Sequence, residues 1–329
     1  MKNQIKVAVA AFAILASGQS LAAVTWTLAG GVDGGATGSV FSGNSWNIGS
    51  ANISGTSAGG TATLGVTAYA NTQGADNSVA ANAQGVQLQT RTANINGSGL
   101  TSGIQNYGGS GLGIINLDAC GTVSGCDANE GANGEHAVDN HQRFEMALLS
   151  FGKATNLTSL QIGWNATDNC GTVGASTCSS AMHDSDMSVL AYTGGGNPLT
   201  SLSSNLTWTQ LLSNGWTLVG NYSDVGSQTD NTTSLLSSAS NRSGGVGSNN
   251  IFSSYWMVGA YNPLANPGGT GPFSTDTGSG QFVDGMKLLK VVGETQGGGG
   301  GGGVPEPGSL ALFGFAMAGI VAMRRRPKA

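Results

Sequence analysis

The fold class follows from two neighbouring stretches, Arg143-Phe144-Glu145-Met146-Ala147-Leu148-Leu149-Ser150-Phe151 and Leu157-Thr158-Ser159-Leu160-Gln161-Ile162-Gly163-Trp164. Each is a short apolar or alternating run, and similar runs recur along the chain between clusters of Gly, Asn and Ser. This pattern is typical of an all-β sandwich or barrel, and no long helical period competes with it. The predicted strands are Val24–Leu28, Thr61–Tyr69, Val86–Thr92, Leu112–Leu117, Arg143–Phe151, Leu157–Trp164, Met187–Tyr192, Trp216–Tyr222, Tyr255–Tyr261 and Met286–Val292.

The strands define one predicted exported domain, residues 24–296, because β-sandwiches of this length often form single units. Within it, a stretch rich in Ser, Asn and Gly from about Thr229 to Asn250 predicts a mobile loop. Seven successive glycines at 297–303 follow the domain and predict a flexible linker.

Composition limits the class of partner. The 329 residues include 56 glycines and only 9% charged residues, so Ser, Thr, Asn and Gly must cover much of the surface. Such a surface suits contact with hydrated polysaccharide or dense matrix, although it also fits a secreted structural protein. The two ends hold six of the 12 basic residues and one of the 17 acidic ones, which leaves the domain about ten net negative charges. Nucleic acid is therefore not expected as a partner.

The first 23 residues have the organisation of a secretory signal peptide. Lys2 and Lys6 give a positive start, residues 7–16 are apolar, and Ser20-Leu21-Ala22-Ala23 is a small-residue cleavage site. We predict cleavage after Ala22 or Ala23. The alternative, an uncleaved N-terminal anchor, is disfavoured because the apolar stretch is too short to span a bilayer comfortably.

The last 26 residues, 304–329, combine three unlike elements. Val304-Pro305-Glu306-Pro307 is followed by an apolar run from Gly308 to Met323 and by a basic end, 324–328, that contains Arg324-Arg325-Arg326. As a helix the run spans about 24 Å, slightly short of a bilayer core that needs about 20 residues. The arginines should stay on the cytoplasmic side because moving their charge through lipid is costly, so the domain lies outside.

This ordered trio at the C-terminus, paired with a signal peptide, resembles the PEP-CTERM signal of Gram-negative bacteria that produce exopolysaccharide. The resemblance covers less than a tenth of the chain. It implies that exosortase processes the chain near Pro305-Glu306-Pro307 after the inner membrane has held the tail as a transient anchor. The protein would then pass to the cell surface or extracellular matrix. The alternative is an ordinary single-span anchor with a proline-containing turn.

The body carries a softer resemblance to the ectodomains of exosortase-dependent surface proteins, which implies a jelly-roll-like β-sandwich over about residues 110–295. It implies no catalytic residue. The matching segments are Gly134-Glu135-His136-Ala137-Val138-Asp139-Asn140, Phe144 to Phe151, Ile162-Gly163-Trp164, Ser188-Val189-Leu190-Ala191-Tyr192, Gly215-Trp216-Thr217-Leu218 and Ser254-Tyr255-Trp256.

The four cysteines form two local pairs, Cys120 with Cys126 and Cys170 with Cys178. An even number in an exported chain predicts two disulfides, although the sequence alone does not fix their pairing. Zinc is disfavoured because no Cys-x-x-Cys occurs and the histidines follow no finger spacing.

The loop after Cys126 is rich in oxygen ligands. Carboxylate and amide oxygens at short spacing in a glycine-containing loop suit calcium, and no other cofactor is expected. The candidate ligands are Asp127, Asn129, Glu130, Asn133, Glu135 and Asp139. The spacing does not match an EF-hand, so a lectin-type loop is the calcium hypothesis. A polar loop whose Asn and Asp side chains cap its own turns is the alternative.

Enzymatic function is not expected. No Gly-x-Ser-x-Gly or His-Glu-x-x-His occurs, and the sequence cannot give the separation that a pair of glycosidase carboxylates would need.

The tryptophans offer the remaining evidence on ligands. Trp164, Trp216 and Trp256 lie in predicted strands and should be core, whereas Trp46 and Trp208 have polar neighbours and could stack on sugars. We therefore expect a non-enzymatic surface or matrix protein associated with exopolysaccharide. The alternative is a lectin-like carbohydrate-binding module, with or without calcium dependence. Exposed, coplanar aromatic side chains would favour this alternative.

Overall fold

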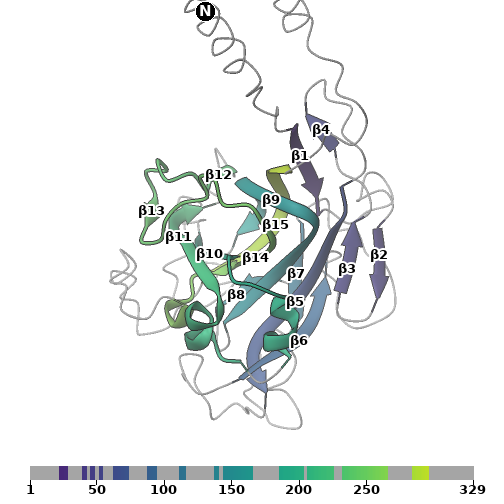
Figure 1. Cartoon of the computed structure of the whole chain (residues 1–329), viewed down its shortest axis with the longest axis vertical. Coiled ribbons are helices and arrows are strands. Elements are labelled where there is room, and N and C mark those ends of the chain that lie inside the picture. Colours follow the sequence, from purple (N-terminus) through teal and green to yellow (C-terminus); the bar gives the residue numbers. More distant parts are fainter. Residues whose placement is uncertain are drawn as a thin grey trace, which may run out of the picture. The chain divides into compact units, whose positions relative to one another are not determined.

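One long strand, β9 (Glu145–Asn165), organises the domain (Figure 1). The sequence predicted two strands here, and the structure corrects this to a single one of 21 residues. The polar segment between the two runs stays extended because other strands satisfy its backbone. Gly152 N–H donates to Thr63 O (3.1 Å), and Trp256 Nε1 donates to Thr155 O (3.1 Å).

The structure is a computed structural model that describes residues 22–28, 39–42, 45–48, 52–54, 62–73, 87–94, 111–115, 137–140, 144–165, 185–203, 206–225, 232–265 and 284–295. All of these belong to one of the two units into which the chain divides, residues 22–57 and 61–296. The predicted signal peptide up to Leu21, the polyglycine linker and the C-terminal tail lie outside the described residues. Within the described part, no helix is long and apolar enough to cross a membrane.

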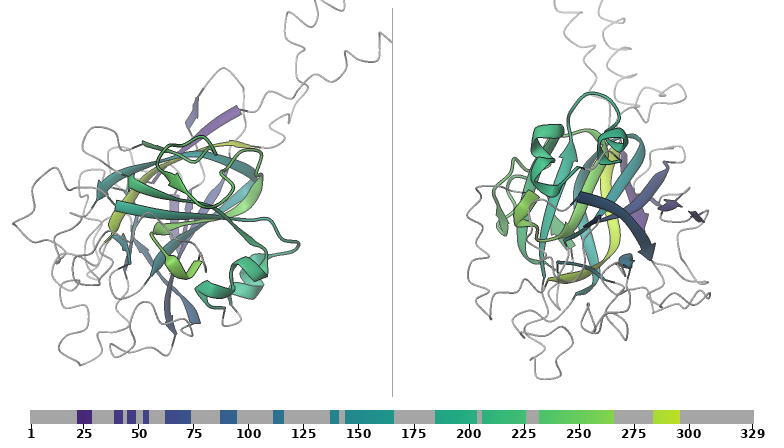
Figure 2. Two further views of the ribbon diagram at one scale, coloured as in Figure 1. Left: turned by 90° about the vertical axis from the view of Figure 1, so that its left-hand side faces the viewer. Right: turned by 90° about the horizontal axis from the view of Figure 1, so that it is seen from below.

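The two halves of β9 belong to two arms of antiparallel sheet (Figures 1 and 2). The first half lies between β5 (Leu64–Gln73) and β14 (Ser253–Ala260), whereas the second half pairs with β15 (Gly285–Thr295) and β12 (Thr232–Ser234). Every strand pairing that the structure describes is antiparallel.

The other strands extend these arms. From β14 the order continues through β10 (Ser185–Tyr192) and β11 (Trp216–Val225) to β13 (Arg242–Ser243). From β15 it continues through β1 (Ala22–Thr27) to β4 (Asn52–Ser54). The strands off this path are β2 (Ser39–Ser42), β3 (Ser45–Ile48), β6 (Gln87–Asn94), β7 (Gly113–Ile115) and β8 (Val138–Asp139).

Both faces of the first half of β9 are buried, which explains why its sequence is almost continuously apolar. Ala147, Leu149 and Phe151 point into one hydrophobic cluster, and Met146 and Leu148 point into a second. Since successive strand residues face opposite sides, a strand covered on both faces needs apolar residues at every position.

The first cluster lies between the two arms. It takes side chains from β1, β5, β10 and β14 as well as β15, with Trp26 and Trp256 fully buried. The Trp26 ring packs edge-on against Phe151 at 4.9 Å. The prediction of an all-β fold is therefore confirmed, whereas the jelly-roll strand order stays a prediction.

The second cluster lies under short helices. These are α2 (Pro198–Leu202) and the 3-10 turns η3 (Trp208–Gln210), η4 (Leu212–Asn214) and η5 (Pro263–Ala265). Leu202, Trp208, Leu211 and Leu264 from this layer pack against the strand residues Met146 and Leu148. The helices thus cover the face of the sheet that would otherwise expose apolar side chains.

The prediction of a mobile loop is wrong for residues 232–250, which form β12, β13 and a set of fastened turns. The Arg242 guanidinium donates to the carbonyls of Ser237 (3.1 Å), Gly244 and Gly245 (2.9 Å). The Tyr222 hydroxyl, buried in β11, donates to Leu235 O (3.0 Å). Burial raises the pKa of Tyr222, so this group remains a donor at physiological pH.

Candidate functional site

Much of the predicted site chemistry lies outside the described residues. This applies to Val304–Pro307 and Arg324–Arg326, to the four cysteines, and to the calcium candidates between Asp127 and Glu135. The disulfides and the calcium site therefore stay predictions. Among the described residues, no group of three or more His, Cys, Asp or Glu could hold a metal ion.

Asp139, the last calcium candidate, and Asn140 lie at the edge of a buried polar cluster. Asp139 is half-buried in β8, and its N–H donates to Glu145 Oε2 (3.3 Å). Asn140 is fully buried, and its Nδ2 donates to Asp284 Oδ2 (2.7 Å) and to Tyr261 O (3.1 Å). In return, Asp284 N–H donates to Asn140 Oδ1 (2.9 Å).

The cluster extends to the start of β10. Asp284 Oδ1 accepts from Asp186 N–H (2.8 Å), and the Ser185 hydroxyl donates to Gly285 O (2.8 Å). Burial raises the pKa of Tyr261, and the charges of Asp186 and Asp284 raise it further. These bonds fasten Asp139 and Asn140 to the sheet. These two residues form one end of the predicted calcium loop, residues 127–140, which we call the acidic loop. The bonds favour a structural role for the cluster. No sequence pattern marked Asp186 or Asp284, because their hydrogen-bond partners are distant in the chain.

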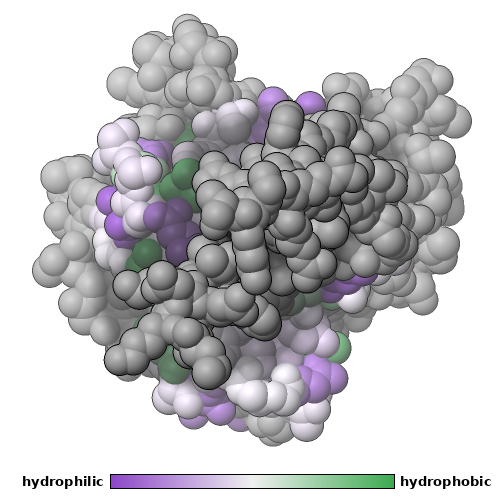
Figure 3. Space-filling view, turned by 45° about the horizontal axis from the view of Figure 1, so that its top comes forward, coloured by the Kyte–Doolittle hydropathy of each residue, from purple (hydrophilic) through white to green (hydrophobic). Residues whose placement is uncertain are grey.

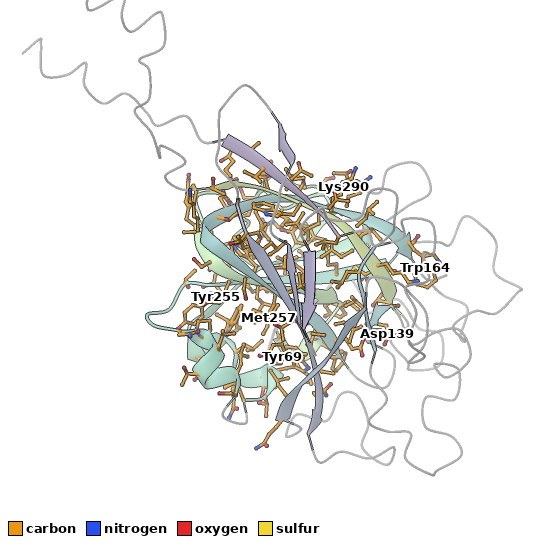
Figure 4. All side chains as sticks on the ribbon, turned by 90° about the vertical axis from the view of Figure 1, so that its right-hand side faces the viewer. Tyr69, Asp139, Trp164, Tyr255, Met257 and Lys290 are labelled. Atoms are coloured by element: carbon orange, nitrogen blue, oxygen red, sulfur yellow. The ribbon has the colours of Figure 1, made fainter. Side chains whose placement is uncertain are left out.

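A second group of polar and aromatic residues lies at the far end of the β9–β15 ladder, where Trp164 faces Lys287. Lys287 Nζ lies 5.2 Å from the centre of the Trp164 ring, a cation–π contact. Figure 4 shows Trp164 at the edge of the described strands, well away from Tyr69 and Met257. The Lys287 side chain is only 5% exposed, and this burial lowers its pKa to about 8.

Trp164 corrects one prediction, because its side chain is 40% exposed and is not core. The reason is a bulge in the ladder. Lys287 pairs with Trp164 and Leu288 pairs with Ile162, so Gly163 has no partner of its own. An extra residue reverses the alternation of faces, and this turns Trp164 away from the core that receives Ile162.

The tryptophans predicted as sugar contacts are placed differently. Trp208 is 1% exposed in the second cluster, so the prediction that it presents a stacking face is wrong. The helical layer buries it despite its polar neighbours. The backbone of Trp46 lies in β3, but its side chain lies outside the described residues. Trp216 and Trp256 are buried, as predicted.

A partly exposed aromatic group also lies at the ends of β10 and β14. Tyr192 contacts Trp216 and Tyr255 with ring centres 5.5 and 6.5 Å apart and interplanar angles of 63° and 83°. These are edge-to-face contacts. The group does not form the coplanar platform that would favour a lectin-like site.

Comparison with protein families gives a match at the C-terminus. The family model of the PEP-CTERM protein-sorting motif matches residues 303–326. The chain carries a PEP-CTERM sorting motif. The resemblance stated from Val304–Pro307, the apolar run and the arginine cluster is thus confirmed.

The PEP-CTERM motif implies export and membrane-associated sorting, with exosortase as the processing enzyme. The match covers only the tail, so it carries no information on what the domain binds. Neither the curated proteins nor the solved structures gave a significant match to the chain.

Proposed function

We propose that this chain is a non-enzymatic exported protein that exosortase releases to the cell surface or extracellular matrix. There, the all-β domain contacts exopolysaccharide or neighbouring matrix proteins. The observation that carries the proposal is the PEP-CTERM match at residues 303–326, which lies C-terminal to a β domain.

The arrangement of the domain's first and last strands supports this proposal. β1 and β15 are paired, with Ala22 opposite Thr295 and Val24 opposite Gly293. The chain therefore enters the domain at the start of β1 and leaves it at the end of β15, and these two strand ends are neighbours. Seven glycines then separate it from the motif, and seven residues reach at most about 25 Å. The linker allows exosortase to act at the motif without unfolding β15.

The surface supports non-covalent contact with a hydrated polymer. On the face in Figure 3, the described surface is mostly hydrophilic or neutral, with small separate hydrophobic areas. Only 9% of all residues are charged, so such contact should depend on hydrogen bonds and aromatic stacking more than on ion pairs. We therefore expect affinity to change little with salt.

A second candidate function is a carbohydrate-binding, lectin-like module. The exposed ring of Trp164 beside Lys287 favours it. Calcium dependence of such a module rests on the sequence of the acidic loop alone.

Co-sedimentation with the exopolysaccharide and matrix of the producing cells tests the proposal. The processed protein should sediment with this material at both 50 mM and 500 mM salt, and it should release no reducing sugar on prolonged incubation. Sugar release would defeat the non-enzymatic proposal. Failure to sediment with any fraction would defeat the proposed contact.

A further inference from the structure

We propose that Trp164 and Lys287 form a subsite that contacts one sugar ring of an extracellular polysaccharide. The inference deepens the proposed function and rests on it. No part of the sequence pattern marked this site, since Trp164 was expected in the core.

The first support is the exposure of the indole. Among the tryptophans with described side chains, Trp26, Trp208, Trp216 and Trp256 are each at most 2% exposed, whereas Trp164 is 40% exposed. Lys287 lies over the ring and restricts its position. A fixed, flat, exposed aromatic surface can stack on the apolar C–H face of a sugar ring without a large entropic cost.

The second support is the Lys287 side chain beside the ring. Lys287 pairs with Trp164 across the β9–β15 ladder, so the two side chains lie on the same face of the sheet. Lys287 is 5% exposed as a residue, and its Nζ lies 5.2 Å from the centre of the indole ring.

The ammonium of Lys287 carries a positive charge and three hydrogen-bond donors, so it suits a ligand rich in acceptor oxygens. A sugar ring combines such oxygens with an apolar face, so it matches both the ammonium and the indole. The ammonium and the ring together favour a sugar as the ligand.

The distribution of exposed apolar residues argues against a protein partner at this site. The large apolar side chains exposed in the described part are Trp164, Leu199 and Val246, and they come from three different elements. A stable protein interface needs about 800 Å² from each partner. A single exposed ring with an adjacent ammonium fits one sugar better than it fits an apolar protein interface.

The test compares variants of the full processed protein by affinity electrophoresis in gels that contain a neutral glucan, a polyuronate or the native exopolysaccharide. Trp164→Ala should weaken binding to the native polymer about tenfold, and Trp164→Phe should retain most of it. Lys287→Met should weaken binding of the polyuronate more than that of the glucan, because it removes the cation. Leu199→Ala is the matched control, since Leu199 is 37% exposed on α2, and it should bind as the wild type does.

The outcomes separate this inference from the proposed function. If the wild type binds the native polymer and Trp164→Ala binds within twofold of it, the subsite is wrong and the proposed function stands. Equal losses in Trp164→Ala and Leu199→Ala would also overturn the subsite. A wild type that binds neither polysaccharide nor matrix removes the proposed function and, with it, the inference. A cooperative urea unfolding transition in each of the four variants shows that altered binding is not loss of folding.

Discussion

Replacement of Trp26 by alanine should remove a large part of the stability of the domain. Trp26 is the largest side chain of β1, the strand that begins at the predicted signal cleavage site. It is fully buried, packs edge-on against Phe151 at 4.9 Å, and donates from Nε1 to Ala62 O (3.3 Å). Truncation leaves a cavity between the two arms of the sheet and a carbonyl without its donor.

Trp→Ala changes in cores cost about 3–5 kcal/mol, and domains are stable by only about 5–15 kcal/mol. Trp26→Ala should therefore leave a marginally stable protein. The measurement is urea unfolding of the processed protein, with the free energy of unfolding taken from linear extrapolation. Trp164→Ala is the matched control, because the same truncation at a side chain 40% exposed should cost about 1 kcal/mol or less.

A loss below about 1 kcal/mol for Trp26→Ala, or equal losses in the two variants, would refute this reasoning. Either result would mean that β1 is a dispensable N-terminal arm. The pairing of β1 with β15 would then not define where the exported domain begins and ends.

Three further outcomes are expected. Burial lowers the pKa of Lys287 to about 8 in the folded protein, whereas the pKa of a lysine in an unfolded chain is about 10.4. Between these two pH values the unfolded chain binds more protons than the folded protein. The free energy of unfolding should therefore rise from pH 8 to pH 10. Lys287→Met should abolish that rise, and a flat profile in the wild type would contradict it. Non-reducing peptide mapping should find Cys120–Cys126 and Cys170–Cys178, whereas free thiols or crossed pairs would overturn the pairing. If the acidic loop binds calcium, a hundredfold excess over the dissociation constant should add about 2.7 kcal/mol to stability, and a melting curve unchanged by calcium and chelator would exclude binding.

The sequence predicted the strands well where their signal is local. Alternation and apolar runs located β1, β5, β10, β11, β14 and β15 within a few residues. The sequence did not predict that two of the predicted strands are one continuous strand, β9. Gly152 and the polar residues after it have the composition of a turn. Their extended form depends on bonds to Thr63 and Trp256, which are far away in the chain.

The errors at the candidate site have the same origin. Trp164 was assigned to the core because alternation predicts one face, and the bulge at Gly163 reverses it. Trp208 was expected at the surface because its neighbours are polar, but the short helices bury it against the sheet. The bond between Asn140 and Asp284 joins residues 144 positions apart, a separation that no local pattern reveals.

The turns of 232–250 show how composition can mislead. Gly244, Gly245 and Gly247 have positive φ values of 58°, 64° and 71°, which glycine adopts at little cost. These glycines let the chain pack closely, since a Cβ on Gly245 would overlap the backbone of Val219. A mobile loop was predicted here because the same glycines are also typical of flexible segments. By contrast, the sorting motif was recognisable because its three parts are contiguous.

The most direct test of the account is mass spectrometry of the protein extracted from the cell surface, compared with a variant in which Pro305, Glu306 and Pro307 are all alanine. If exosortase processes the chain as proposed, the released wild type lacks every peptide beyond the Pro-Glu-Pro region, and the variant keeps its tail and stays in the inner membrane. Peptides from Phe313 to Arg326 in the released wild type, or unchanged sorting of the variant, would contradict it.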